Sequence, residues 1–160
     1  MALSNSIHFP NNLRIIIRDQ SYKEPIARIA VTLVVFAKRR NDYYLGLPLS
    51  DSQGIIEVNK VWIENAIDFL RNTFIMDYSS NLEECSPQVL LDVMSNDQIE
   101  RAKSAMKLHK AEEGGLDIAY TARDLENTNN RYYENRKIYV LLDNTGIQNK
   151  IIEIVLKKTS

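Results

Sequence analysis

The sequence predicts a mainly β protein, an antiparallel β-sandwich of about seven strands with two inserted α-helices. Three observations predict it. Short β-branched and apolar runs alternate with polar turns, the hydrophobic period becomes helical only over about residues 60–76 and 96–113, and the chain ends in a hairpin pattern. Residues 1–160 are expected to form a single domain, with 1–11 as a flexible N-terminal segment.

Three strands are expected in the first third of the chain, and a basic turn joins the second to the third. Leu13–Arg18 is a β-branched run, and Pro25 stands before the next strand, where its missing N–H is tolerated. Both faces of Ile29–Phe36 are apolar, which predicts a central strand buried on both sides. Lys38–Asp42 is the basic turn, and Tyr43–Leu47 is the returning strand.

A glycine-closed turn and a helix follow. In Ser50–Gly54 the Ser and Asp side chains can accept backbone N–H groups, and the glycine can adopt a positive φ before the strand Ile55–Val58. The period then becomes helical, with Asn59 as the expected N-cap. The helical stripe consists of Trp62, Ile63, Ala66, Ile67, Phe69, Leu70, Thr73 and Phe74.

The middle of the chain predicts a loop, a strand and a second helix. Asp77–Pro87 is expected to be a polar loop and Gln88–Met94 a strand. Ser95 and Gln98 have the spacing of a capping box, and Gly114-Gly115 is the expected end of the helix that follows. The apolar face of this helix is thin, as is typical of a helix that covers an edge. It consists of Ile99, Ala102, Ala105, Met106 and Leu108.

The last third predicts an exposed loop and a terminal hairpin. Leu116–Ala122 is expected to be a short strand or helical turn, and the asparagine-rich segment Asn127–Asn135 an exposed loop. Ile138–Leu142 and Lys150–Leu156 are expected to pair across the turn 143–146. In the second of these strands, the alternation directs residues 152, 154 and 156 toward the core.

The stretch Pro25–Val58 carries a family resemblance. A proline-led, valine-rich strand, a return strand and the turn Ser-Asp-Ser-Gln-Gly resemble transthyretin-like and collagen-binding-B-type sandwich domains, which include the carboxypeptidase regulatory-like modules. The resemblance covers about a quarter of the chain and implies a fold rather than an activity. The purine-pathway hydrolase of that superfamily uses histidines, an arginine and a C-terminal Tyr-Arg-Gly-Ser signature, whereas this chain ends Leu-Lys-Lys-Thr-Ser.

Composition excludes several classes of function. Twenty basic and 21 acidic residues give a net charge of −1, which provides no global footprint for nucleic acid or an anionic membrane. The longest apolar run is too short to span a bilayer, and the N-terminus lacks the features of a signal peptide. With one cysteine and neither targeting nor spanning segments, the expected location is the cytoplasm.

No pattern predicts catalysis, a cofactor or a metal. His8 and His109 lie a hundred residues apart and have no ligand spacing. Glu83 and Glu84 beside Cys85 should raise the pKa of its thiol, which disfavours a nucleophile. An enzyme with a site assembled from scattered residues stays an alternative. Its residues would include His109, Asp117, Tyr120 and Arg123.

Two segments interleave basic residues with a tyrosine pair, and they supply the candidate binding residues. These residues are Arg39, Arg40 and Tyr43 in the first segment, and Arg131, Tyr132, Tyr133 and Arg136 in the second. Arg and Tyr dominate the energetics of protein interfaces, and they also stack on bases and neutralise phosphates. The structural alternative is a charged turn in which one tyrosine points inward and one outward.

These observations predict a non-catalytic interaction domain that recognises a protein partner and self-associates, with paired edge strands as a contact mode. Acidic residues within both segments argue against nucleic acid, and nothing indicates a membrane. A small-molecule or carbohydrate-binding module that uses the same tyrosines is the alternative, together with the enzyme described above.

Overall fold

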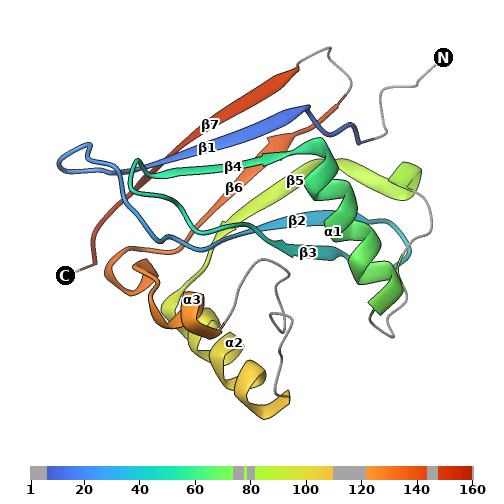
Figure 1. The fold of residues 1–160 in the computed structure, drawn as a ribbon. Coiled ribbons are helices and arrows are strands. Elements are labelled where there is room, and N and C mark those ends of the chain that lie inside the picture. Colours follow the sequence, from blue (N-terminus) through green and yellow to red (C-terminus); the bar gives the residue numbers. More distant parts are fainter. Residues whose placement is uncertain (1–6, 74–77, 79–81, 110–121, 144–147, 160) are drawn as a thin grey trace.

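The structure is a computed structural model that describes residues 7–73, 78, 82–109, 122–143 and 148–159. It is mainly β, with two sheets and three α-helices in the described residues (Figure 1). The strands are β1 Asn12–Asp19, β2 Val31–Ala37, β3 Tyr43–Gly46, β4 Ile55–Asn59, β5 Cys85–Val93, β6 Arg136–Leu141 and β7 Asn149–Leu156. The helices are α1 Lys60–Thr73, α2 Asn96–His109 and α3 Ala122–Glu126, with short 3-10 turns at Leu82–Glu84 and Asn130–Tyr132.

The strands divide into a three-stranded sheet of order β4-β1-β7 and a four-stranded sheet of order β3-β2-β5-β6. All pairs in the four-stranded sheet are antiparallel, and β2 lies inside it, as its two apolar faces predict. In the other sheet β1 is antiparallel to β4 but parallel to β7 over Asn12–Asp19. The expectation of a purely antiparallel architecture is therefore wrong for this pair.

The predicted C-terminal hairpin is also wrong. β6 pairs with β5 in one sheet, and β7 pairs with β1 in the other, so the chain crosses between the sheets after β6. The segment 144–147 of the expected turn lies outside the described residues. The facing of β7 is as predicted, because Ile154 and Leu156 are buried whereas Glu153 and Lys157 are exposed.

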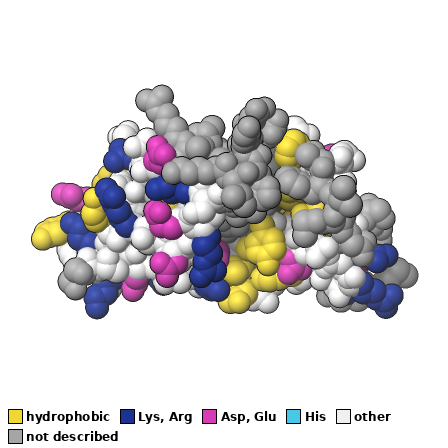
Figure 2. All heavy atoms as spheres, turned by 90° about the horizontal axis from the view of Figure 1, so that it is seen from below, with side chains coloured by type: hydrophobic (Ala, Val, Ile, Leu, Met, Phe, Trp, Pro, Cys, Tyr) yellow, Lys and Arg dark blue, Asp and Glu magenta, His cyan; other side chains and the backbone are white. Residues whose placement is uncertain are grey.

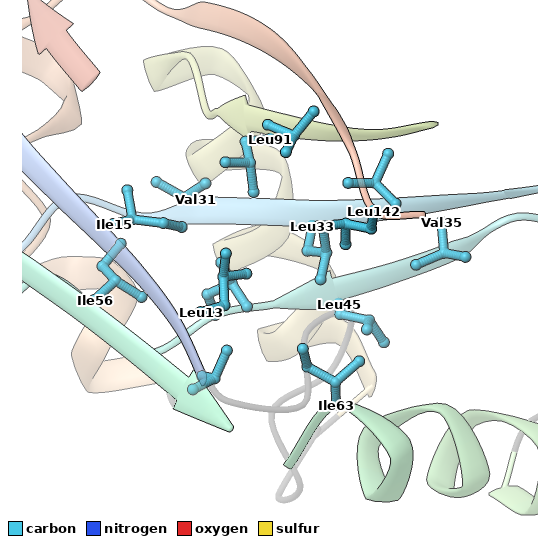
Figure 3. Packing of buried hydrophobic residues seen from close by; sticks show 14 of the residues in the cluster. Leu13, Ile15, Val31, Leu33, Val35, Leu45, Ile56, Ile63, Leu91 and Leu142 are labelled. Atoms are coloured by element: carbon cyan, nitrogen blue, oxygen red, sulfur yellow. The ribbon is translucent and has the colours of Figure 1, made fainter. Parts of the chain in front are cut away.

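The two sheets share one apolar core. Side chains from alternate positions of β1 and β2 point toward one another between the sheets (Figure 3). The contributing residues labelled in that view are Leu13, Ile15, Val31, Leu33, Val35, Leu45, Ile56, Ile63, Leu91 and Leu142. Burial of this apolar surface is the main favourable contribution to folding.

Helix α1 packs against β3 and β4, the edge strands of the two sheets on one side of the molecule (Figure 1). Asn59 is its N-cap as predicted, because its Oδ1 accepts the N–H of Trp62 at 2.7 Å. The buried face is centred on Ile63, Ala66, Ile67 and Leu70, with Trp62 partly buried at its margin.

Helix α2 begins at the predicted capping box. The Ser95 N–H donates to Oε1 of Gln98 at 2.7 Å, and the Gln98 N–H donates to Oγ of Ser95 at 3.2 Å. Its apolar residues form a second, smaller cluster below the start of β2. This cluster consists of Ala30, Met94, Ile99, Ala102 and Leu125, with Leu49 packed against it. The expected glycine stop and the segment 116–121 lie outside the described residues.

Two loop expectations change. Ile7 and Phe9 are buried in the main core, and the His8 N–H donates to the Leu142 carbonyl at 2.9 Å, so residues 7–11 are part of the packed fold. Cys85 and Pro87, expected in a loop, belong to β5. No helix among the described residues is both long and apolar enough to cross a membrane.

Candidate functional site

The two basic and aromatic segments lie at opposite ends of the four-stranded sheet. The second segment enters the sheet at Arg136, which pairs with Val93, and Val93 pairs with Val31 at the start of β2. The first segment follows the other end of β2, where Ala37 pairs with Cys85. A strand rises about 3.3 Å per residue, so roughly 20 Å separates the two ends. The structure therefore does not bring the predicted binding residues together into one site.

In the first segment, Arg39 and Arg40 are exposed in the turn between β2 and β3, but Tyr43 is fully buried. Nε of Arg71 donates to the Tyr43 hydroxyl at 2.8 Å, and the ring of Tyr78 stacks on the Tyr43 ring at 4.8 Å. The prediction of Tyr43 as a surface binding residue is wrong, because strand alternation turns it inward. Its neighbour Tyr44 is exposed, as the structural alternative predicts.

Burial keeps the Tyr43 hydroxyl and the neighbouring Cys85 thiol protonated beside Arg71. Burial raises the pKa of the Tyr43 hydroxyl, and Arg71 only partly opposes this effect. Burial likewise raises the pKa of the Cys85 thiol, so the thiol is neutral near pH 7. A surface hollow of about 400 Å³ lies beside Arg71 on α1, but the guanidinium there supports the buried hydroxyl.

In the second segment, Asn130 fixes the loop to the four-stranded sheet. It is 1% exposed, and its Oδ1 accepts the Ala30 N–H at 2.8 Å. Its Nδ2 donates to the carbonyls of Ala30 at 3.0 Å and Met94 at 2.8 Å. The amide side chain therefore satisfies three backbone groups at the ends of β2 and β5. The prediction of a wholly exposed loop over 127–135 is wrong at this position.

Asn129 fixes the same loop to the segment before β2. Its N–H donates to the Arg28 carbonyl at 2.8 Å, and its Nδ2 donates to the Ala27 carbonyl at 2.8 Å. Arg28 has a positive φ of 56°, and its Nε donates to the Asn127 carbonyl at 2.8 Å. Left-handed backbone is costly for a residue other than glycine, and these hydrogen bonds hold Arg28 in it.

Tyr133 is half-buried and anchors the end of the loop to β1. Its hydroxyl donates to Oδ2 of Asp19 at 3.0 Å. Burial alone would raise the pKa of Asp19, but the N–H groups of Ser21 and Tyr22 and the Tyr133 hydroxyl donate to the carboxylate and hold its pKa below the ordinary value. Burial and the same hydrogen bond raise the pKa of Tyr133 to about 12. Asp19 and Tyr133 thus support the fold rather than a ligand.

Between these anchors lies a cleft of about 410 Å³, called here the Tyr132 cleft. It is lined by Pro25, Ile26, Ala27, Asn129, Tyr132, Tyr133 and Lys158. The Tyr132 ring is 47% exposed, and the guanidinium carbon of Arg131 lies 4.7 Å from its centroid. Tyr132 lines the cleft, and Arg131, which is not part of the lining, places a cation against the Tyr132 ring.

Arg136 belongs to a different part of the second segment. Its Nη1 donates to the Val155 carbonyl at 2.6 Å, which links β6 of one sheet to β7 of the other. Of the predicted binding residues, the Tyr132 cleft is therefore lined by the exposed Tyr132 and the supporting Tyr133, and Arg131 adjoins it through its contact with Tyr132.

The remaining parts of the Tyr132 cleft were not predicted. Ile26 and Ala27 lie about a hundred residues before the loop, and Lys158 lies about 25 residues after it. No local sequence pattern links these residues. The proline at position 25 and the asparagine run were visible in the sequence, but their proximity depends on the pairing of distant strands.

The described residues also bear on two other kinds of site, a metal centre and an enzyme site assembled from scattered residues. No group of three or more His, Cys, Asp or Glu side chains gathers among the described residues in a way that could hold a metal ion. Of the scattered enzyme candidates, Asp117 and Tyr120 lie outside the described residues, and so do the side chains of His109 and Arg123. Comparison of the chain with protein-family models, curated proteins and solved structures found no match.

Proposed function

We propose that this protein is a non-catalytic β-sandwich module of the transthyretin-like kind, which recognises a protein partner through the Tyr132 cleft. The observation that carries the proposal is the exposed Tyr132 at the wall of a cleft, with Arg131 against its ring, in a loop fixed by the buried Asn130 and the half-buried Tyr133. The expected cytoplasmic location of the module is part of the same proposal.

The chemistry of the pair suits a protein partner. Tyr and Arg are enriched among the residues that contribute most to interfaces, because each combines a large contact area with a hydrogen-bonding end. The Tyr132 ring offers an apolar face, Arg131 adds a cation, and Lys158 adds another charge at the lining. On the face in Figure 2, basic and acidic side chains are interspersed, which argues against a nucleic-acid surface on that face.

The rigidity of the loop supports the same function. Residues on either side of the exposed pair are fixed, Asn130 by three hydrogen bonds and Tyr133 by its bond to Asp19. A partner therefore meets side chains whose backbone is already ordered, which lowers the entropic cost of binding.

The test is quantitative affinity capture from a lysate of the source organism with the double variant Arg131→Ala/Tyr132→Ala. The variant leaves Tyr133 intact, because loss of its bond to Asp19 would disturb the fold. Both replaced side chains are exposed, so the free energy of unfolding should change by less than about 1 kcal/mol. We expect the proteins enriched by the wild type to fall at least tenfold.

Tyr44→Ala is the matched control, because Tyr44 is also an exposed tyrosine but lies toward the other end of the four-stranded sheet. It should capture the same proteins as the wild type. Equal capture by the double variant, or an equal loss with Tyr44→Ala, would overturn the assignment of binding to the Tyr132 cleft.

A small polar or carbohydrate ligand is the second candidate function. Its supporting observation is the volume of the Tyr132 cleft, about 410 Å³, which lies within the range of small-molecule sites, with Asn129, Tyr132 and Lys158 as polar groups. A thermal-shift screen of sugars and metabolites tests it, since a ligand that binds only the folded state raises Tm. No shift in the screen, together with partner capture, would favour the protein-binding function.

A further inference from the structure

The side of the molecule opposite α1 carries the terminal strand of each sheet. α1 packs against β3 and β4, whereas β6 and β7 are the terminal strands on the other side (Figure 1). Among the described residues, no backbone group pairs with the outer edge of β6. A free edge offers N–H and C=O groups to any strand that can approach it.

The hydrogen-bond alternation identifies which groups of β6 point outward. The Leu142 N–H donates to the Pro87 carbonyl at 2.7 Å, toward β5. Because directions alternate along an antiparallel strand, Val140 and Ile138 also face β5, whereas Leu141, Tyr139 and Lys137 face outward. Two further bonds obey the same alternation across the sheet, from the Met94 N–H to the Ala30 carbonyl and from the Leu47 N–H to the Val31 carbonyl.

The outer edge of β6 has few of the features that prevent pairing with another strand. Tyr139 is 58% exposed and Leu141 53%, and Lys137 is the only charged residue of the three. The register with β5 runs without a bulge from Gln88–Leu141 to Val93–Arg136, and β6 contains no proline. Bulges, prolines and several charges are the usual means by which proteins prevent edge pairing.

We propose that β6 binds β6 of a second copy of this chain, antiparallel across a two-fold axis, with Tyr139 opposite Tyr139 of the second copy. In this register the outward N–H and C=O groups of Lys137, Tyr139 and Leu141 all face outward groups of the second copy. The contact is isologous, so the same edge serves both copies and the assembly closes as a dimer.

The side chains favour a second copy over an unrelated strand. The register sets Lys137 of one copy opposite Leu141 of the other, so no like charges lie opposite each other. It also sets Ile138 opposite Val140, so these two apolar side chains lie opposite each other. The tyrosine at the axis forms a cross-strand aromatic pair. A neighbouring half-buried ring continues the surface, because Phe36 stacks on Tyr139 with 6.4 Å between centroids.

Disulfide trapping tests the register. With Tyr139→Cys, the two Cα atoms across the axis lie about 5.5 Å apart, within disulfide range. With Leu141→Cys, the two cysteines are offset by four residues, roughly 13 Å, and out of range. Cys85 is buried and is the same in both variants. Mild oxidation should crosslink Tyr139→Cys and leave Leu141→Cys uncrosslinked; equal crosslinking of both, or of neither, would overturn the proposal.

Sedimentation of uncrosslinked protein supplies a second readout, with circular dichroism to verify folding. The wild type should change from monomer to dimer as its concentration rises. Tyr139→Lys sets like charges opposite each other and should weaken the dimer, whereas Leu141→Glu sets a carboxylate opposite Lys137 of the second copy and should tighten it roughly threefold. A wild type that stays monomeric up to millimolar concentration, or a dimer indifferent to both substitutions, contradicts the proposal.

Discussion

Asn130 is the residue that ties the loop of the Tyr132 cleft to the sheet, and its replacement has a clear expected cost. Asn130→Ala leaves the Ala30 N–H and the Met94 carbonyl buried without this partner, whereas the Ala30 carbonyl still accepts the Met94 N–H. Unsatisfied buried groups cost about 1–3 kcal/mol each, so we expect a loss of about 3 kcal/mol in the free energy of unfolding, measured by urea titration. The exposed Asn135→Ala should change it by less than about 0.5 kcal/mol.

Asn130→Asp separates hydrogen bonding from side-chain volume. The carboxylate has nearly the same size, but it cannot donate to the carbonyls of Ala30 and Met94. It should destabilise the protein at neutral pH at least as much as Asn130→Ala. Stability equal to the wild type in either variant would show that the loop does not depend on this amide.

Asp19 and Tyr133 predict a stability that falls at both extremes of pH. Because the pKa of Asp19 in the folded protein is below its ordinary 3.8, its contribution is complete above that value and disappears as the pH falls below it. Because the pKa of Tyr133 is raised to about 12, its contribution is complete below the ordinary 10.0 and disappears as the pH rises through about 12.

Asp19→Asn checks the acid arm of this prediction. The difference in unfolding free energy between the wild type and the variant should be large at pH 6 and should shrink as the pH falls below the ordinary pKa of 3.8, because the folded-state pKa of Asp19 is lower still. Tyr133→Phe should destabilise the protein at pH 6, because the hydroxyl that donates to Asp19 is removed. A wild-type-to-variant difference that is the same at pH 6 and pH 3 would contradict the assigned role of Asp19.

At the scale of elements, the turn before β4 depends on one glycine. Gly54 has φ 73°, and a Cβ built on it would lie 2.4 Å from the Ile17 carbonyl oxygen. Asp51 Oδ1 meanwhile accepts the N–H groups of Gln53 and Ile55, so the turn has no freedom to move away. Gly54→Ala should therefore cost about 3 kcal/mol or prevent folding.

The measurement is chemical denaturation of Gly54→Ala beside Ser52→Ala. Ser52 is an exposed residue of the same turn, so its replacement should change stability by less than about 0.5 kcal/mol. If the two variants were equally stable, the close approach between the turn and β1 would not be a constraint on this fold.

Signals contained within a few residues predicted the structure well. The Gly54 turn, the Asn59 cap and the Ser95–Gln98 capping box are local, and each was readable from residue type and spacing. Strand alternation predicted that one tyrosine of the pair points inward. It did not predict that this is Tyr43 rather than Tyr44, because the partner of the buried hydroxyl, Arg71, lies 28 residues away. The role of Asn130 depended on Ala30, 100 residues away, so the asparagine run suggested only a loop.

Strand pairing was the part that the sequence could not supply. β6 and β7 have the alternation of a hairpin, yet each pairs with a strand from a distant part of the chain. Pro87 made the start of β5 look like a loop. The strand accommodates Pro87 because the Pro87 carbonyl still accepts the Leu142 N–H. Pro87 has no N–H to donate to the Leu142 carbonyl, and this carbonyl accepts the His8 N–H instead.

At the scale of the whole molecule, the two proposed contacts use separate surfaces. The Tyr132 cleft lies at the end of the core where Pro25 meets the 129–133 loop, and the β6 edge runs along the side opposite α1 (Figure 1). Partner capture and self-association can therefore be tested independently, because variants at Arg131 and Tyr132 leave the outward groups of β6 unchanged. A dimer would present two Tyr132 clefts and would bind a repetitive partner with increased avidity.

The most direct test of partner binding at the Tyr132 cleft is hydrogen exchange measured with and without the captured partner. The account predicts slowed exchange in peptides that cover residues 25–28 and 129–133, and no change in the turn at 38–42. Slowed exchange confined to other segments, or none at all with a bound partner, would contradict the central claim that this cleft is the recognition site.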